Sequence, residues 1–215
     1  NKDDKHAPQI IKAANCELYT YSEESKEADF VASDIRYVSQ PDFVGTEFHI
    51  SGKYDMEVRL GIPGLFNVVN ALAAVSVCSF LGLDQARISH ALENIRVNGR
   101  MEIVYTSERC TVLVDYAHNA VSMESLLSTL RDYKPKRLVC VFGCGGNRSK
   151  DRRYSMGEIG GKMADLSIIT ADNSRYEKVE DIIADIRGSI EKTGGKFIEI
   201  PDRREAIRYS ILHAQ

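Results

Sequence analysis

The chain has no long apolar run and no excess of positive charge. Its longest apolar stretch, residues 68–83, is interrupted by Asn70, Ser76, Ser79 and Gly82. A stretch this short and polar predicts a buried helix rather than a membrane span. The formal net charge of −3 argues against nucleic acid as the main partner. We therefore expect a globular protein that acts on small molecules.

Paired cysteines are also missing, because the 5 cysteines show no Cys-x-x-Cys spacing. An odd number of scattered cysteines is typical of free thiols in a reducing compartment, so we expect a cytoplasmic protein, without a signal peptide. Cys140 and Cys144 are close in sequence, but a predicted strand and a glycine turn separate them. Because no second ligand pair accompanies them, we expect no zinc or other metal site within these residues.

The second half of the chain alternates short apolar segments with helical patterns. The predicted strands cover residues 111–115, 137–142, 166–170 and 196–200. Apolar residues recur at helical spacing within residues 123–130, 179–190 and 203–215. Repeated βα units with right-handed crossovers predict an α/β fold with a doubly wound, Rossmann-like parallel sheet.

The first half differs in character. Its predicted strands cover residues 17–21, 30–37, 45–51 and 56–60 and are joined by polar turns. Two helices are expected to follow, one after Pro63-Gly64 and one that begins at Asp84 as N-cap. The polar, glycine-containing segment 94–102 separates the two halves. We therefore predict two domains, residues 1–97 and residues 98–215.

Two polar motifs directly follow predicted strands. We call residues 143–148 (GCGGNR) the glycine loop and residues 172–175 (DNSR) the DNSR motif. In an open parallel sheet the ligand crevice lies outside the carboxyl ends of the strands, so the two motifs predict one shared pocket. A third motif, residues 115–118 (DYAH), also follows a predicted strand and is expected to reach the same crevice.

The chemistry of these motifs leaves alternatives open. The glycine loop fits neither the dinucleotide nor the P-loop template, so it predicts a tight turn that carries Arg148, or a plain turn whose basic residues, Arg153 included, are solvated. The DNSR motif suits an amino acid, because Arg175 can grip a carboxylate and the Asp172 and Asn173 oxygens can accept from an ammonium group. Its alternative is a cap for the following helix.

Three further polar residues are candidates. Asn67 and Asn70 lie in the first turns of an apolar helix, where either a nucleotide base or backbone carbonyl groups could satisfy their amides. His118 is expected near the start of a helix, where it could pack or act in catalysis.

Five motifs occur together, in the order of one family. Residues 64–74, residues 99–102 (GRME), the DYAH motif, the glycine loop and the DNSR motif resemble the Mur ligases in order and spacing. The resemblance extends over the whole chain. It implies the second half of a central ATPase domain, followed by most of a Rossmann-like C-terminal domain. A fragment is therefore expected, without the UDP-sugar domain, the Gly-Lys-Thr phosphate loop and the groups that position magnesium.

The resemblance also implies roles for particular residues. Asn67 and Asn70 would face the adenine of ATP, Arg100 its phosphates and Asp115 its ribose. His118, close to the nucleotide, is the catalytic candidate. The residues that would hold the incoming amino acid are those of the DNSR motif and the arginine of the glycine loop: Arg148, Asp172, Asn173, Ser174 and Arg175.

The implied reaction is amide formation in peptidoglycan synthesis, with ATP and Mg²⁺ as cofactors. ATP phosphorylates the D-glutamate side chain of a UDP-N-acetylmuramoyl dipeptide, and the amine of a third residue attacks the acyl phosphate. Family members that use meso-diaminopimelate carry Asp-Asn-Pro-Arg. This chain keeps Arg175 but has Ser174 in place of proline, so diaminopimelate is the expected amino acid. A monomer is expected, inactive as a fragment.

Other functions stay open. Within the family, a lysine-adding ligase or a folylpolyglutamate-type relative is the alternative. In another class, a nicotinamide-dependent oxidoreductase would use the glycine loop and Asp165, but it leaves the DNSR motif and the Asn67/Asn70 helix without a purpose. A non-catalytic binding module is the third class, expected only if neither ATP nor an amino acid binds.

Overall fold

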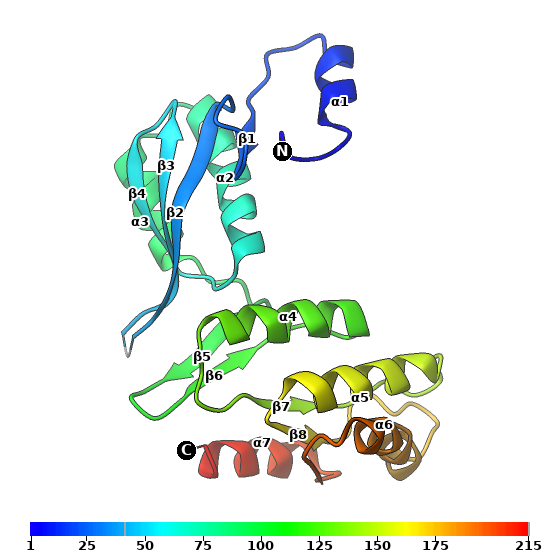
Figure 1. Cartoon of the computed structure of the whole chain (residues 1–215). Coiled ribbons are helices and arrows are strands. Elements are labelled where there is room, and N and C mark those ends of the chain that lie inside the picture. Colours follow the sequence, from blue (N-terminus) through cyan, green and yellow to red (C-terminus); the bar gives the residue numbers. More distant parts are fainter. Residues whose placement is uncertain (41, 215) are drawn as a thin grey trace. The chain divides into compact units, whose positions relative to one another are not determined.

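The computed structural model describes residues 1–40 and 42–214 and divides into two compact units, Asn1–Glu108 and Arg109–Gln215 (Figure 1). The domain boundary expected near residue 97 falls in the loop before β5 (Glu102–Thr106) and stays a prediction. Within the described residues, no helix is long and apolar enough to cross a membrane.

A four-stranded sheet forms one layer of the first unit. Its strands, in spatial order, are β1 (Tyr21–Ser22), β2 (Phe30–Ser39), β3 (Val44–Gly52) and β4 (Met56–Leu60). β1 is parallel to β2, whereas β2 and β3, and β3 and β4, pair in antiparallel fashion. Buried residues such as Phe30, Phe48 and Ile50 form the sheet side of the core.

The strand predicted at residues 17–21 is wrong except at its last residue. Residues 17–20 form no strand, and only Tyr21 and Ser22 pair with β2. The carboxylate of Asp29 accepts hydrogen bonds from the backbone N–H of Thr20 at 2.7 Å and from its hydroxyl at 2.8 Å. A local side chain thus takes the backbone donor that a longer strand would use.

Helices form the other layer of the first unit. They are α2 (Leu65–Phe80) and α3 (Gln85–Asn94), while α1 (Ala7–Ala13), which the sequence did not indicate, lies apart from this layer (Figure 1). α2 begins directly after Gly64 and buries Val68, Leu72 and Val75 against the sheet. Asp84 caps α3 by accepting from the backbone N–H of Arg87 at 2.9 Å, so the predicted helix start is confirmed.

The second unit contains a parallel sheet of three strands, β7 (Val139–Phe142), β8 (Leu166–Ile169) and β9 (Phe197–Glu199), in that order. β6 (Thr111–Val114), predicted as a fourth strand of this sheet, instead forms a two-stranded sheet with β5. The burial of these strands differs accordingly. All four residues of β8 are buried, as a central parallel strand requires, whereas both end residues of β6 are exposed.

Helices cover both faces of the parallel sheet, as Figure 1 shows. They are α4 (Ala120–Asp132), α5 (Asp151–Met163), α6 (Val179–Thr193) and α7 (Arg203–Leu212). Residues of α4, α5 and α6 share one core cluster with Phe142 and Ile169, while Ala206 of α7 packs with Leu166 and Ile168 in another. The predicted doubly wound arrangement is therefore confirmed for these strands.

α5 lies close to its neighbours because glycines form its inner face. A Cβ added at Gly160 would lie 3.0 Å from the ring of Phe142, and one at Gly157 would lie 2.6 Å from the carbonyl oxygen of Ile186 in α6. The close packing continues toward the start of the helix. There Arg153 is only 1% exposed, although the sequence suggested a solvated side chain.

Candidate functional site

The glycine loop and the DNSR motif are in direct contact. The backbone N–H of Gly146 donates to the carbonyl oxygen of Asn173 at 2.8 Å. In return, the Nη1 of Arg175 donates to the carbonyl oxygen of Gly146 at 2.6 Å. The backbone N–H of Tyr176 donates to Oδ1 of Asn147 at 3.1 Å. The structure thus brings together the two motifs that follow β7 and β8, as the strand order predicts.

The glycines of the loop allow this approach. A Cβ on Gly146 would collide with the carbonyl oxygen of Ser174, and one on Gly145 would lie 2.9 Å from Nη1 of Arg175. A larger residue at position 146 would therefore push the two motifs apart, whereas one at position 145 would displace the Arg175 side chain. The glycines act here through the space that they leave for the facing backbone, which explains why the loop matches no phosphate-binding template.

Most functional groups of the two motifs face solvent. Arg148, Asp172, Asn173 and Arg175 are exposed, and Ser174 is half-buried. Arg175 has a φ of 51°, a left-handed conformation that the two loop-to-loop hydrogen bonds around it hold in place. The surface so formed presents two guanidinium groups, a carboxylate and an amide, which are the groups that recognise a zwitterionic amino acid.

The alternative interpretation of the DNSR motif, a helix cap, is wrong. α6 begins at Val179, and its N-cap is Lys178, which makes no side-chain cap hydrogen bond. Asp172 instead accepts from the backbone N–H of Asn173 at 2.8 Å, within the motif itself. The motif therefore ends before the N-cap position, and its side chains do not cap the backbone N–H groups of the first turn of α6.

A partly buried ion-pair network, centred on Arg153, adjoins the two motifs. Nη2 of Arg153 bonds both carboxylate oxygens of Glu177, at 2.7 and 2.8 Å, and Nη1 bonds Asp185 of α6 at 2.9 Å. Oε1 of Glu177 also accepts the backbone N–H of Asn147. The hydrogen bond from Arg153, followed by that from Asn147, lowers the pKa of the Glu177 carboxyl. Sequence reasoning missed Glu177, which carries no motif signal. The alternative interpretation of the glycine loop, a plain turn with solvated basic residues, is wrong for Arg153.

The DYAH motif leads into α4. Asp115 accepts from the backbone N–H of Ala117 at 2.8 Å, and Nδ1 of His118 lies 3.1 Å from the carbonyl oxygen of Tyr116. Since a carbonyl only accepts, Nδ1 must carry the proton in this contact. Because β6 pairs with β5, the expectation that this motif follows a strand of the parallel sheet is wrong.

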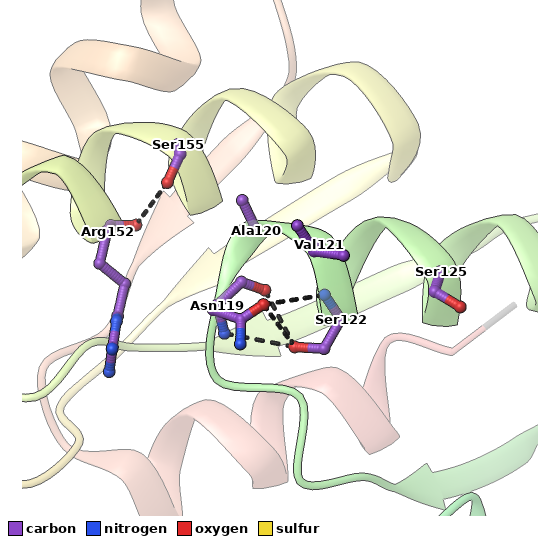
Figure 2. Close-up of a pocket in the computed structure, with 7 residues that line it drawn as sticks. All are labelled: Asn119, Ala120, Val121, Ser122, Ser125, Arg152 and Ser155. Atoms are coloured by element: carbon purple, nitrogen blue, oxygen red, sulfur yellow. Dashed lines mark hydrogen bonds between the residues drawn. The ribbon is translucent and has the colours of Figure 1, made fainter. Parts of the chain in front are cut away.

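An open depression of about 680 Å³ adjoins the start of α4. Figure 2 shows the residues that line it, Asn119, Ala120, Val121, Ser122 and Ser125 of α4 with Arg152 and Ser155 of α5. Asn119 and Ser122 bond each other reciprocally as a capping box, with Oδ1 of Asn119 accepting from the Ser122 N–H at 2.9 Å. These polar groups thus serve the helix end itself.

The nucleotide candidates of the first unit lie on or after its helices. Nδ2 of Asn67 donates to the carbonyl oxygen of Pro63 at 2.7 Å, and Nδ2 of Asn70 donates to Oδ1 of Asn67 at 3.2 Å. Both side chains thus lie on α2, as expected, with Asn70 exposed. Arg100 is exposed in a turn where Gly99 has a φ of 68° and Met101 a φ of 46°.

Metal ligands are not grouped in the described part of the chain, where no three His, Cys, Asp or Glu side chains lie together so as to hold an ion. The thiol of Cys144 is buried 3.8 Å from the sulfur of Met156. Burial raises the pKa of Cys140 to about 12 and that of Cys144 to about 11. These cysteines are therefore protonated, packed thiols at neutral pH.

Two known domain families match most of the chain. A profile of the Mur ligase middle domain matches residues 1–78, and a profile of the Mur ligase, glutamate ligase domain matches residues 99–215. A UDP-N-acetylmuramoyl-L-alanyl-D-glutamate--2,6-diaminopimelate ligase from Caldanaerobacter subterraneus subsp. tengcongensis is 38% identical over 100% of this chain. The chain spans 44% of the length of that relative.

Solved structures agree with this assignment. The structure of a UDP-N-acetylmuramoyl-L-alanyl-D-glutamate--2,6-diaminopimelate ligase matches 99% of this chain and 44% of its own, with a TM-score of 0.74 and 33% identity. A folylpolyglutamate synthase from Thermotoga maritima, 22% identical, matches 95% of this chain and 46% of its own with a TM-score of 0.73, which shows a shared fold alone. On the two domain profiles, which together match most of its residues, this chain belongs to the Mur ligase family.

Proposed function

We propose that the protein that carries this chain is an ATP-dependent ligase of peptidoglycan synthesis. It joins meso-diaminopimelate to the D-glutamate side chain of UDP-N-acetylmuramoyl-L-alanyl-D-glutamate. Membership of the Mur ligase family and the 38% identity to a relative named for this activity support the proposal. The chain contributes the surface on which the incoming amino acid is held.

The observation that carries the proposal is the direct pairing of the glycine loop with the DNSR motif. The pairing gathers the groups for a diamino dicarboxylic acid on one exposed surface. Arg148 and Arg175 supply guanidinium forks for carboxylates, and Asp172 and Asn173 supply oxygens that accept from an ammonium group. Lysine has one carboxylate fewer, so it leaves one of the two arginines unused.

Specificity for diaminopimelate is carried by Arg175. The left-handed backbone and the bond to Gly146 hold this side chain against the glycine loop. Lysine is the second candidate substrate, because Ser174 stands where family members that use diaminopimelate carry proline. Ser174 is half-buried and its carbonyl oxygen packs against Gly146, so a change there also moves the loop contact.

ATP is proposed to bind elsewhere on the chain. Asn67 and Asn70 would face the adenine, Arg100 the phosphates and Asp115 the ribose, with His118 near the nucleotide. Amide side chains can pair with a base edge because each both donates and accepts. Nδ1 of His118 is engaged with the backbone carbonyl oxygen of Tyr116 at 3.1 Å, which leaves Nε2 for a contact with the nucleotide.

In the proposed reaction, the γ-phosphoryl group of ATP passes to the D-glutamate side-chain carboxylate and ADP leaves. The amine of diaminopimelate then attacks the acyl phosphate, phosphate departs, and the attacking nitrogen loses a proton as the amide forms. Such a reaction depends on positioning and on cationic groups around the transferred phosphoryl group more than on protein nucleophiles. Among the described residues, no three His, Cys, Asp or Glu side chains are grouped so as to hold magnesium. The roles proposed for this chain are to orient the amine and to contact ATP.

The test is amide formation by the purified protein that carries this chain. It is incubated with ATP, magnesium, the UDP-N-acetylmuramoyl dipeptide and either diaminopimelate or lysine, and products are identified by mass. We expect a tripeptide product and a kcat/KM for diaminopimelate about thirtyfold or more above that for lysine, since one charged bidentate contact is lost with lysine. Preference for lysine would overturn the diaminopimelate assignment but keep the ligase.

Failure to form any amide would overturn the ligase itself. In that case two further titrations separate the remaining classes. Quenching or energy transfer from NADH fluorescence would indicate a nicotinamide-dependent oxidoreductase. Glutamate added to a folate substrate would instead indicate a folylpolyglutamate-type relative.

A further inference from the structure

Arg153 is a charged side chain buried beneath the turn that carries Arg148. We propose that Arg153 is a positioning residue for amino-acid recognition, which acts through Glu177 on the backbone of the glycine loop. This inference rests on the proposed ligase function. It assigns a role to a residue outside both motifs, at the start of α5, and to the acidic residue two positions after the DNSR motif.

The first step is the geometry of the Arg153 side chain. Its two terminal nitrogens divide their bonds between two acidic partners. Nη2 bonds both oxygens of Glu177, at 2.7 and 2.8 Å, and Nη1 bonds Asp185 at 2.9 Å. One arm therefore reaches the segment that follows the DNSR motif, and the other reaches α6.

The second step is the position of Glu177 between the two motifs. Oε1 of Glu177 accepts the backbone N–H of Asn147, in the glycine loop. The side chain of Asn147 in turn accepts the backbone N–H of Tyr176, next to Glu177, at 3.1 Å. These two bonds join the end of one motif to the end of the other. Because Asn147 directly precedes Arg148, they fix the backbone from which Arg148 extends.

The third step is the choice of arginine. Arg153 is 1% exposed, and its Nε has no hydrogen-bond partner among the described residues. A charge buried at this cost is a poor source of stability, because apolar residues of similar volume would pack as well. A planar fork that orients Glu177 explains its presence, and lysine cannot replace that fork because it presents a single ammonium point charge.

Kinetics of the protein that carries this chain provide the first test. Three variants are compared, Arg153→Lys, Glu177→Ala and Asp185→Asn. The first two disturb the link from Arg153 through Glu177 to the backbone of Asn147. Asp185→Asn disturbs only the ion pairs that Asp185 makes with Arg153 and with Lys150. We expect Arg153→Lys and Glu177→Ala to raise the KM for diaminopimelate about tenfold or more, with the KM for ATP changed by less than about twofold.

The control decides between positioning and general stability. Asp185→Asn removes a partner of the same arginine, so it should lower the unfolding midpoint as Arg153→Lys does, yet leave the KM for diaminopimelate within about twofold. An equal rise in this KM for Asp185→Asn, or a parallel rise in both KM values for Arg153→Lys, would overturn the proposal.

Nuclear magnetic resonance of the chain itself provides a test that needs no activity. The amide proton of Asn147, bonded to Glu177, should follow the titration of that carboxylate in the unmodified chain and in Asp185→Asn. It should shift upfield and lose this response in Glu177→Ala. An unchanged Asn147 amide in Glu177→Ala would overturn the positioning role even if ligase activity is found, whereas the expected shifts without any ligase activity would refute the proposed function alone.

Discussion

The guanidinium of Arg175 donates a 2.6 Å hydrogen bond to the carbonyl oxygen of Gly146, across the contact between the two motifs. Because a guanidinium carries five N–H donors, this one bond orients the side chain and leaves the other donors available for a ligand. The residue proposed to grip a carboxylate is thus oriented by the loop that faces it.

Replacement of Arg175 should weaken diaminopimelate binding. In the protein that carries this chain, we expect Arg175→Ala to raise the KM for diaminopimelate roughly thirtyfold or more, since a bidentate charged contact is worth about 2 to 5 kcal/mol. The KM for ATP should change little. Arg187→Ala is the control, because Arg187 pairs with Glu199 at 3.0 Å, away from the DNSR motif. An unchanged KM for diaminopimelate in Arg175→Ala would contradict the proposed role of Arg175 in binding it.

A methyl group at Gly146 should destabilise the second unit. The Cβ of Gly146→Ala would collide with the carbonyl oxygen of Ser174, so we expect a loss of about 1 to 3 kcal/mol in the free energy of unfolding. Gly188→Ala in α6 is the matched control, because nothing lies within 4 Å of a Cβ there. That variant should gain about 0.5 to 1 kcal/mol from helix propensity. Chemical denaturation measures the free energy of unfolding of both variants. Equal changes in the two variants would contradict the prediction for Gly146.

The cysteines should differ in their reactivity toward an alkylating reagent at pH 8. Cys16 is exposed, so we expect it to be labelled first. Cys140 and Cys144 should resist, because burial raises their pKa to about 12 and about 11 and keeps both as thiols. Mass spectrometry of the digested protein locates the label, and denaturant should make every cysteine reactive. Early labelling of Cys144 in the folded chain would show that the glycine loop opens.

Stability in acid should depend on Asp165. Hydrogen bonds from Arg131, at 3.0 Å, and from the backbone N–H of Leu138 lower the pKa of its carboxyl. A folded-state pKa below the unfolded value means that this contribution is present above the unfolded pKa and is lost as the pH falls through the folded one. Asp165→Asn should therefore show a weaker loss of stability between neutral pH and about pH 3. Denaturation at a series of pH values, with Asp132→Asn as control, measures the slope.

The 215-residue chain alone should not hydrolyse ATP in response to an amino acid. Its sequence contains no Gly-Lys-Ser/Thr phosphate loop, and its described residues form no metal site. Phosphate release with ATP, magnesium and diaminopimelate measures the rate, and the longer protein that carries the chain is the positive control. Turnover by the chain alone would refute the interpretation of its sequence as part of a larger catalytic unit.

Local signals in the sequence predict most of this fold. The N-cap at Asp84, the apolar helix after Gly64 and the buried strand 166–170 each carry a pattern that the structure confirms. The helix from Asp151 to Met163 is missed because glycines take several positions of its inner face. Only Met156, Ile159 and Met163 remain as an apolar pattern, which is weak because glycines stand between them.

The candidate site could be predicted only in part from the sequence, for a similar reason. The contact between the glycine loop and the DNSR motif follows from the order of parallel strands. The strand before Asp115 pairs with β5 instead, which is a long-range choice that no local pattern contains. Burial of Arg153 is equally non-local, because it depends on Glu177 and Asp185, more than twenty positions later in the chain.

The glycines of α5 should make the proposed amino-acid surface sensitive to mutations that lie outside both motifs. Gly157 and Gly160 allow α5 to pack closely against α6 and the sheet. Arg153 lies on the same helix, one turn before Gly157. A bulkier residue at either glycine would lift the helix and withdraw the guanidinium from Glu177. Selection for altered amino-acid preference should therefore recover changes in this helix interior, at positions that no substrate touches.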